Sequence, residues 1–400
     1  MQLGWVDFSK EDRQKVFDVM NLLQEQGAVD ELGIGIVRDA FANYFFPGTS
    51  TIQTRAKYFL IVPYLLKEAG TGNYGSDVNR IMRAIDAEEK QCGILLLDST
   101  PDVDGIVGKR VLPKGWVARK PSDIYWNGIR TFGIFKQNSL SIAEYVSIAS
   151  KIKAQKNKTK IGNRGDDGED ADRDDADAGD ISSYQFWELP IFKENWRDNL
   201  NIELLPDEAV FLKKQIMKQV PDTLLAYILK NNVDVDTYDS FASLTKDLES
   251  KVPAHMSEMM RLACDFNSLV YMSRVRYNVL LSEGNNKAAT DEWQWLEQDM
   301  KTRACVDLQA VFEKLNIYNP KTFAFLSMLQ ELFQKGQIEE ADALIRKREV
   351  QLKGINRAKL NRTKEHDPNA WVGGGWLDYR FFDARRIIDD IYHGEVNAHV

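Results

Sequence analysis

The chain has 400 residues, of which 44% are apolar and 28% are charged, and its formal net charge is −8. This composition is typical of a globular protein, and the length is sufficient for two or three domains with a sizeable core. The longest apolar stretch, Tyr58 to Leu66, is too short to cross a bilayer, and the first twelve residues lack the pattern of a secretory signal, so we expect a cytoplasmic protein without a membrane partner.

Cysteine and histidine are scarce. Cys92, Cys264 and Cys305 are odd in number, far apart and without a C-x-x-C motif, which favours a reducing compartment over a disulfide framework. The four histidines show no H-x-x-x-H spacing. We therefore assign no metal ligands, no cofactor and no catalytic residues.

The first part of the chain is predicted to be mostly helical. Apolar spacing and capping residues predict helices at 10–24, 52–68, 77–91, 121–132 and from Ser141 to about Lys153. Ile94 to Leu97 is the best strand candidate, and residues 107–118 are its expected partner across a turn. Two short helices beside a small hairpin would suit a winged-helix arrangement.

Residues 163–180 form the best boundary in the chain. The segment has nine acidic and two basic residues and no large apolar side chain, so it is predicted to be a disordered acidic linker. It divides the chain into a mixed, mostly helical domain at 1–162 and a helical domain at 181–400.

The charge reverses immediately before this linker. Residues 105–160 carry twelve Lys and Arg against only Asp123 and Glu144. Charge balance on a solvated surface is the favoured interpretation. The alternative is an electrostatic gate, in which the linker competes with a polyanion for the basic surface.

The remainder reads as almost all helix. Prolines at 206 and 221 begin two helices, and apolar residues on several sides of 257–283 predict a central buried helix. Further helices are expected at the ranges 291–315, 320–335, 338–353 and 377–392. The fold class is therefore mainly α, with a mixed N-terminal domain that contains the small hairpin and an all-helical C-terminal domain.

Catalytic motifs are weak. Glu249-Ser250-Lys251 together with Asp222 matches only the loosest pattern of a metal-dependent nuclease, and it lies on predicted helix instead of adjoining strands. Gly373-Gly374-Gly375 could present backbone N–H groups to a phosphate, but no strand precedes it, and a flexible approach to the last helix is the favoured interpretation.

Basic residues with aromatic residues between them are the remaining signal. Lys and Arg could neutralise phosphates, and exposed aromatics could stack on unpaired bases. The aromatics are Trp116, Tyr125, Trp126, Phe132 and Phe135, most of which we expect to be buried in the core. The candidate nucleic-acid-binding residues are Arg55, Lys57, Lys109, Arg110, Lys114, Arg119, Lys120, Arg130 and Lys136. For Arg55 and Lys57 the alternative is a buried ion pair. A second basic stretch at 346–364 could form a basic ridge.

Four segments carry a resemblance to a known family: MQLGWVDFS at 1–9, residues 46–59, PSDIYWNGIR at 121–130 and GGGWLDYR at 373–380. They resemble a bacterial protein family of unknown function, over essentially the whole chain. The resemblance implies a setting beside helicases, methyltransferases and phospholipase D-like nucleases in anti-phage defence clusters. It implies no activity and no catalytic residues.

These observations lead to one hypothesis and two alternatives. The hypothesis is a non-enzymatic accessory subunit of an anti-phage defence or DNA-processing system, which binds DNA or a partner enzyme of the same gene cluster, such as a helicase, methyltransferase or nuclease, through residues 105–136. The alternatives are a divergent metal-dependent nuclease and a protein-interaction scaffold. Large exposed apolar patches on residues 183–400 would favour the scaffold.

Overall fold

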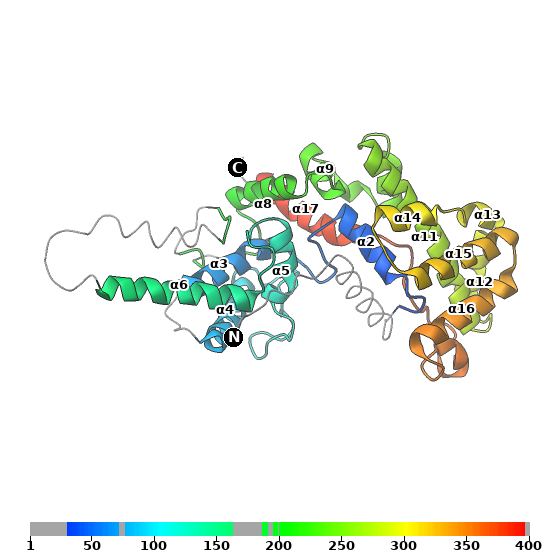
Figure 1. Ribbon diagram of the computed structural model, residues 1–400, viewed down its shortest axis with the longest axis horizontal. Coiled ribbons are helices and arrows are strands. Elements are labelled where there is room, and N and C mark those ends of the chain that lie inside the picture. The colour runs from blue at the N-terminus through cyan, green and yellow to red at the C-terminus, as the bar shows by residue number, and fades with distance from the viewer. Residues whose placement is uncertain (1–29, 72–76, 163–185, 191–194, 199, 397–400) are drawn as a thin grey trace, which may run out of the picture. The chain divides into compact units, whose positions relative to one another are not determined.

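A computed structural model describes most of the chain (Figure 1). The described residues are 30–71, 77–162, 186–190, 195–198 and 200–396. The expected helix at 10–24 and the acidic linker at 163–180 lie outside them. The prediction of a mainly helical fold is confirmed, because helices make up most of the described residues.

The described residues divide into two compact units, and each unit is built from two separate stretches of chain. Unit 1 comprises the described residues up to Tyr44 together with 238–379. Unit 2 comprises the described residues of 45–237 together with those from Arg380 onward. This division does not follow the predicted boundary at 163–180, because residues on both sides of that segment belong to unit 2.

The helices of unit 1 surround one long central helix. They are α2 (Gly35–Phe45), α10 (Phe241–Leu248), α11 (Ala254–Leu281), α12 (Lys287–Gln298), α13 (Met300–Arg303), α14 (Leu308–Lys314), α15 (Pro320–Lys335), α16 (Ile338–Lys353) and the 3₁₀ turns η2 (Lys359–Asn361) and η3 (Thr363–Glu365). The predicted central helix is confirmed as α11, which buries residues on several sides and contacts α10, α12 and α16. The single helix expected at 291–315 is wrong, since this range holds part of α12 and all of α13 and α14.

Local capping explains where two of these helices meet. The Asn319 side chain accepts a hydrogen bond from the Thr322 N–H and so begins α15. Gly336 ends that helix with a φ of +72°, a left-handed conformation that favours glycine. The helices predicted at 320–335 and 338–353 are confirmed as α15 and α16, which pack against each other.

Unit 2 places α17 against α8, although about 160 residues separate them in the chain. The helices are α3 (Tyr58–Thr71), α4 (Val78–Ser99), α5 (Pro121–Thr131), α6 (Ile142–Gly162), α8 (Pro206–Gln219), α9 (Leu224–Asn231), η1 (Val235–Thr237) and α17 (Phe381–Val396). Figure 1 shows α17 running beside α8, and α17 buries Phe381, Ala384, Ile387, Ile388 and Ile391. The predicted last helix was placed four residues too early.

The predicted strand at Ile94–Leu97 is wrong, because these residues continue α4 to Ser99. The helix buries Ile81, Ile85, Cys92 and Leu96, whose spacing is that of one helical face. Nothing after Gly93 breaks this period, so the run of apolar residues extends the helix.

The winged-helix arrangement is wrong for the same reason. Residues 107–114 form successive turns, residues 115–117 are irregular, and Gly105 and Gly108 have positive φ angles. Within the described ranges the only β-pairing is one isolated antiparallel bridge between Phe135 and Trp187. α5 and α6 do occur where helices were predicted.

None of the described helices is both long enough and apolar enough to cross a membrane. All three cysteines are free thiols: Cys92 is buried, Cys264 is half-buried and Cys305 is exposed. Burial raises the pKa of the Cys92 thiol to about 12.

Candidate functional site

Two of the predicted nucleic-acid-binding residues are structural cations of unit 2. Lys57 is buried and its Nζ lies 2.5 Å from Oε2 of Glu208. Arg55 donates from Nε and Nη2 to the Asp390 carboxylate, at 2.9 and 2.8 Å from Oδ1. Both side chains tie the start of α3 to helices far along the chain, so we remove them from the candidate surface.

Three more predicted residues are engaged with neighbouring groups. Lys120 pairs with Asp86 at 2.9 Å, and Lys136 pairs with Glu188 at 2.8 Å. Arg130 donates from Nη1 to the backbone carbonyl of Asn138. Their charges are partly neutralised, and these residues contribute less to any field that attracts a polyanion.

The expectation that most of the aromatics are buried is confirmed. Tyr125, Trp126, Phe132 and Phe135 belong to the core of unit 2, and the Tyr125 hydroxyl donates to the Arg55 carbonyl. Trp116 is half-buried. The aromatics therefore do not supply a row of exposed rings for base stacking.

The segment 106–120, here called the basic loop, is fixed against α4. The Trp116 indole N–H donates to Oδ1 of Asp86 at 2.9 Å, and the same oxygen pairs with Lys120. Gly93 brings α4 close to the loop: a Cβ at this position would lie 2.8 Å from Cδ1 of Leu112. The loop is thus anchored near its middle and at its end.

The basic loop presents three exposed cations. Arg110, Lys114 and Arg119 are exposed, and none of them forms an ion pair with another described residue. Lys109 is more restrained, since its Nζ donates to the Val103 carbonyl at 3.0 Å.

A buried carboxylate lies at the junction of α4 and α5. Glu89 accepts hydrogen bonds from the Ser122 N–H at 2.6 Å and from the Ser122 hydroxyl at 3.2 Å. Burial raises its pKa to about 7, although both hydrogen bonds act in the opposite direction. Glu89 therefore caps the first turn of α5, immediately after the basic loop.

The second basic stretch does not form a continuous ridge, because three of its cations are engaged within unit 1. Arg348 is buried and donates to the Leu32 carbonyl and to the Thr322 hydroxyl. Lys353 and Lys359 both bind Oε1 of Glu31, at 3.2 and 3.0 Å. These cations hold the segment before α2 in unit 1.

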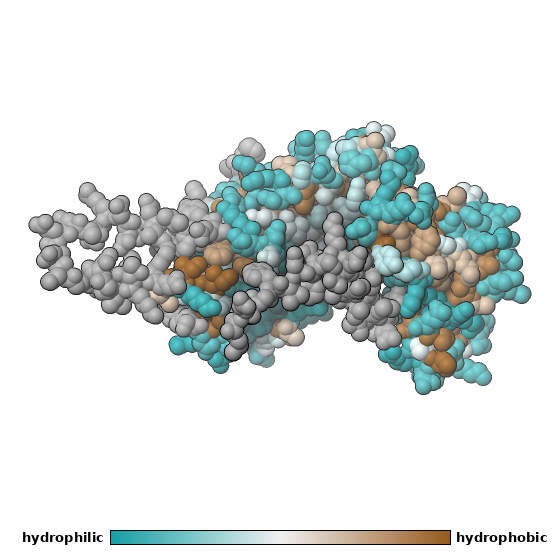
Figure 2. Space-filling model, viewed as in Figure 1, coloured by the Kyte–Doolittle hydropathy of each residue, from teal (hydrophilic) through white to brown (hydrophobic). Residues whose placement is uncertain are grey.

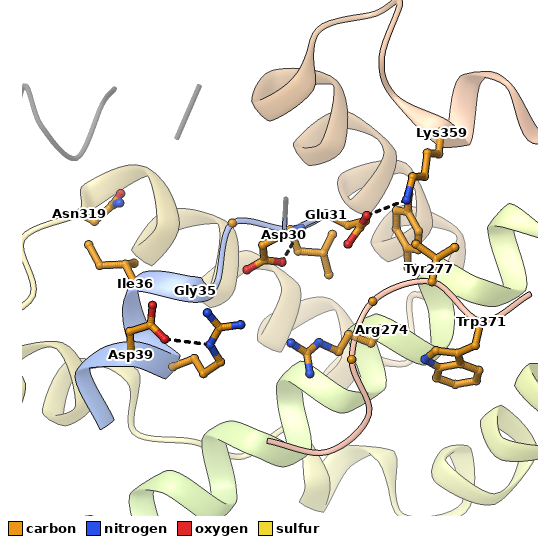
Figure 3. Close-up of a pocket in the computed structure, with 16 residues that line it drawn as sticks. Asp30, Glu31, Gly35, Ile36, Asp39, Arg274, Tyr277, Asn319, Lys359 and Trp371 are labelled. Atoms are coloured by element: carbon orange, nitrogen blue, oxygen red, sulfur yellow. Dashed lines mark hydrogen bonds and ion pairs between the residues drawn. The ribbon is translucent and has the colours of Figure 1, made fainter. Parts of the chain in front are cut away.

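A pocket of about 730 Å³ lies in unit 1, between α2, α11 and residues 371–374, and is here called the α11 pocket (Figure 3). Figure 3 shows the Arg274 side chain extending from α11 into the pocket, with the Glu31–Lys359 ion pair on another side. Sequence analysis did not find this site.

One face of α11 organises the wall of the pocket. Asn278 uses both ends of its amide, accepting from the Val372 N–H at 2.7 Å and donating to the Val372 carbonyl at 2.9 Å. Asn267 binds the N–H and carbonyl of Leu377 in the same way. Between these two clamps, Arg274 donates to the Gly375 carbonyl at 2.6 Å. The segment 372–377 is therefore held along three turns of α11.

The sequence does contain a signal for this wall. Asn267, Tyr271, Arg274 and Asn278 follow the i, i+4, i+7, i+11 spacing of one helix face. The Tyr271 ring stacks on Trp376 with ring centroids 4.0 Å apart. Polar residues at this spacing within a buried helix indicate a bound backbone segment, and the triple glycine lies within that segment.

A smaller pocket of about 500 Å³ lies in unit 2, beside α17. It contains Asp389, Asp390 and His393, and Arg55 lines it as well. Burial raises the pKa of Asp389 to about 6, with Asp236 and Asp390 adding to the shift and Arg385 and His393 opposing it. Sequence analysis missed this cluster, although the three residues lie within one turn and a half of α17.

The residues that suggested a metal-dependent nuclease do not form a metal site in the described part of the structure. Lys251 pairs with Asp247 at 2.8 Å, and Glu249 is the C-cap of α10. Among the described residues, no group of three histidine, cysteine or acidic side chains is arranged to hold a metal ion.

Exposed apolar residues bear on the scaffold alternative. In unit 1 the large ones are Trp295, Tyr318, Met328, Ile355 and Trp376, which belong to different segments. Figure 2 shows hydrophobic side chains interspersed with hydrophilic ones on this side of the unit. Isolated exposed apolar residues are ordinary on protein surfaces.

In the comparison with known proteins, a family model matches only the first part of the chain. Residues 1–160 match the model of a family described as a family of unknown function (DUF6361). The match includes the basic loop and three of the four segments that carry the resemblance, while the segment 373–380 lies outside it. No curated protein and no solved structure matches the chain.

Proposed function

We propose that this protein is a non-enzymatic accessory subunit of a bacterial anti-phage defence or DNA-processing assembly, which binds DNA through the basic loop. The observation that carries the proposal is the set of three exposed cations, Arg110, Lys114 and Arg119, on a loop that is anchored to α4. The setting is the one implied by the resemblance of the four segments to a bacterial family of unknown function.

An anchored loop is a favourable support for phosphate contacts. A cation that must order a flexible loop on binding loses conformational entropy, whereas a fixed loop has already incurred that cost in folding. Three cations can neutralise about three phosphates and release their counterions. The aromatic rings are mostly in the core, so base stacking adds little, and we expect little preference for sequence or for single strands.

The test is binding to labelled duplex and single-stranded DNA across a salt series. We expect the variant Arg110→Glu, Lys114→Glu, Arg119→Glu to lose at least about tenfold in affinity at low salt. The slope of log K against log salt should fall by about 2.7 on duplex DNA, at about 0.9 per phosphate contact.

A second triple variant separates the position of these charges from the net charge. Lys347, Arg357 and Lys364 are exposed cations of unit 1, and replacing them with Glu changes the net charge by the same amount. This variant should retain most of the affinity. An equal loss in both variants, or no binding by the native chain, would exclude the basic loop as a DNA site, and a partner enzyme of the same gene cluster would then be sought by co-purification.

A further inference from the structure

The α11 pocket contains a guanidinium that lacks an acidic partner. Arg274 donates one hydrogen bond, to the Gly375 carbonyl, and forms no ion pair with any described residue. Burial lowers its pKa, and the proximity of Arg38 lowers it further, against opposing effects of Asp30, Tyr379 and Glu31. A half-buried cation near a second cation is an arrangement that an anion stabilises.

The other charges around the pocket are mostly neutralised by protein groups. Glu31 is bound by Lys353 and Lys359, and the Arg38 guanidinium pairs with Asp39 at 3.0 Å. Arg274 is therefore the cation with the most unused hydrogen-bonding capacity.

Asp30 provides the complementary group. Its Oδ1 accepts from the Leu32 N–H at 3.2 Å, while its Oδ2 is buried and has no hydrogen-bond partner. An unsatisfied buried carboxylate oxygen is costly in a native protein and is satisfied by a donor. Both Oδ2 of Asp30 and Nη2 of Arg38 lie 3.6 Å from the position of a Cβ on Gly35, the first residue of α2. The pocket thus offers anion donors and one strong acceptor.

Size and shape restrict the ligand further. A volume of about 730 Å³ is within the range of pockets for small organic ligands and is much larger than inorganic phosphate or an amino acid requires. Trp371 lines the pocket and can pack against a planar ring. Gly374 keeps the wall close to Arg274, since a Cβ there would lie 3.1 Å from Nη1.

We infer that the α11 pocket binds a free nucleoside phosphate. Arg274 and Arg38, with the first-turn N–H groups of α2, receive the phosphate, and Oδ2 of Asp30 accepts from hydroxyl groups of the sugar. Trp371 contacts the base. The inference concerns residues of unit 1 and does not depend on DNA binding by the basic loop.

The test is isothermal titration calorimetry of the full-length chain. The ligands are the four ribonucleoside 5′-monophosphates, adenosine, inorganic phosphate and a 5′-phosphorylated trinucleotide. We expect at least one monophosphate to bind at least tenfold more tightly than adenosine and inorganic phosphate. Tighter binding of the trinucleotide would overturn the inference, because it would assign the pocket to a strand end.

Substitutions at the pocket residues test whether the monophosphate binds in the α11 pocket. Arg274→Gln should weaken monophosphate binding at least tenfold, and Arg38→Gln should act in the same direction while leaving the Arg274–Gly375 bond in place. Asp30→Asn should weaken binding of the monophosphate, because the acceptor for the sugar hydroxyl groups is lost. It should not weaken binding of inorganic phosphate, because the variant removes a carboxylate that repels the anion. Arg261→Gln, exposed on the same helix, is the matched control and should bind as the native chain does. Failure of every monophosphate to bind at millimolar concentration, or unchanged binding by Arg274→Gln and Asp30→Asn, would overturn the inference.

Discussion

Glu89 shows how one buried side chain makes stability depend on pH. Its pKa is raised from 4.5 to about 7, so between these values the folded protein holds a proton that the unfolded chain has released. The free energy of unfolding therefore falls as pH rises from about 4.5 to 7, and this loss is complete above pH 7.

The variant Glu89→Gln should remove this dependence. A glutamine oxygen can still accept from the Ser122 N–H, and the cost of burying a charge disappears. We expect the variant to be more stable than the native chain at pH 8 by up to about 3 kcal/mol and nearly equal at pH 4.5. Urea unfolding at both pH values measures the difference.

Asp98→Asn on the same helix is the control, because Asp98 is exposed. It should change the free energy of unfolding by less than about 0.5 kcal/mol at either pH. If Glu89→Gln kept the pH dependence of the native chain, the ionisation would have to be assigned to another group.

Single residues also mark the limit of sequence reasoning. Lys57 was predicted as a surface cation or a buried ion-pair partner, and Arg348 lies in the predicted basic ridge. Both are buried: Lys57 binds Glu208, 151 residues away, and Arg348 donates to the Leu32 carbonyl, 316 residues away. Charge and spacing do not reveal a partner so distant in the chain. The basic loop was predicted as part of a strand, so the exposure of Arg110, Lys114 and Arg119 followed only from their charge, because charged side chains are rarely buried without a partner.

At the scale of elements, the two asparagine clamps of α11 make a specific prediction. Asn278→Ala removes the acceptor for the Val372 N–H and the donor to the Val372 carbonyl. Leaving these groups unpaired should lower the free energy of unfolding by about 2 kcal/mol. Amide hydrogen exchange at Val372 should increase by a larger factor than exchange in α15.

Asn361→Ala is a suitable comparison, because Asn361 is exposed and donates only one hydrogen bond, of 3.2 Å, to the Ile355 carbonyl. It should leave exchange at Val372 unchanged. Equal exchange at Val372 in the native chain and in Asn278→Ala would show that the clamp does not hold the segment.

Most helices were predictable, because apolar period and caps act locally. Pro121 and Pro206 begin α5 and α8 as expected, and α11 was identified by apolar residues on several sides. The helix α4 was cut short because the β-branched and aliphatic run at 94–97 fits a strand as well as a buried helix. The candidate pocket was missed because its wall, 371–377, has no secondary structure and is defined by side chains 100 residues earlier.

At the scale of the whole molecule, charge is distributed unevenly. Deleting residues 163–180 changes the net charge from −8 to −1. If DNA binds through the basic loop, we expect the deletion to raise affinity several-fold in 50 mM salt and much less in 0.5 M salt, where screening shortens the range of charge interactions.

A neutral Gly-Ser segment of the same eighteen residues separates charge from length. It should bind DNA as the deletion variant does. Binding equal to that of the native chain in both variants would show that residues 163–180 balance the surface charge without competing for the loop.

Unit 2 is built from two stretches of chain that are far apart in the sequence, and this has a consequence for folding during synthesis. The apolar face of α8 packs against α17, and Arg55 near the start of α3 binds Asp390 on that helix. During synthesis, α3 and α8 leave the ribosome long before their partner exists, while the whole stretch 238–379 is still to be translated. The apolar surface of unit 2 that α17 covers therefore stays exposed until α17 has been translated, whereas the central helix of unit 1 is translated before that point. Nascent chains that stall after residue 237 should accordingly depend on chaperones that bind exposed apolar segments.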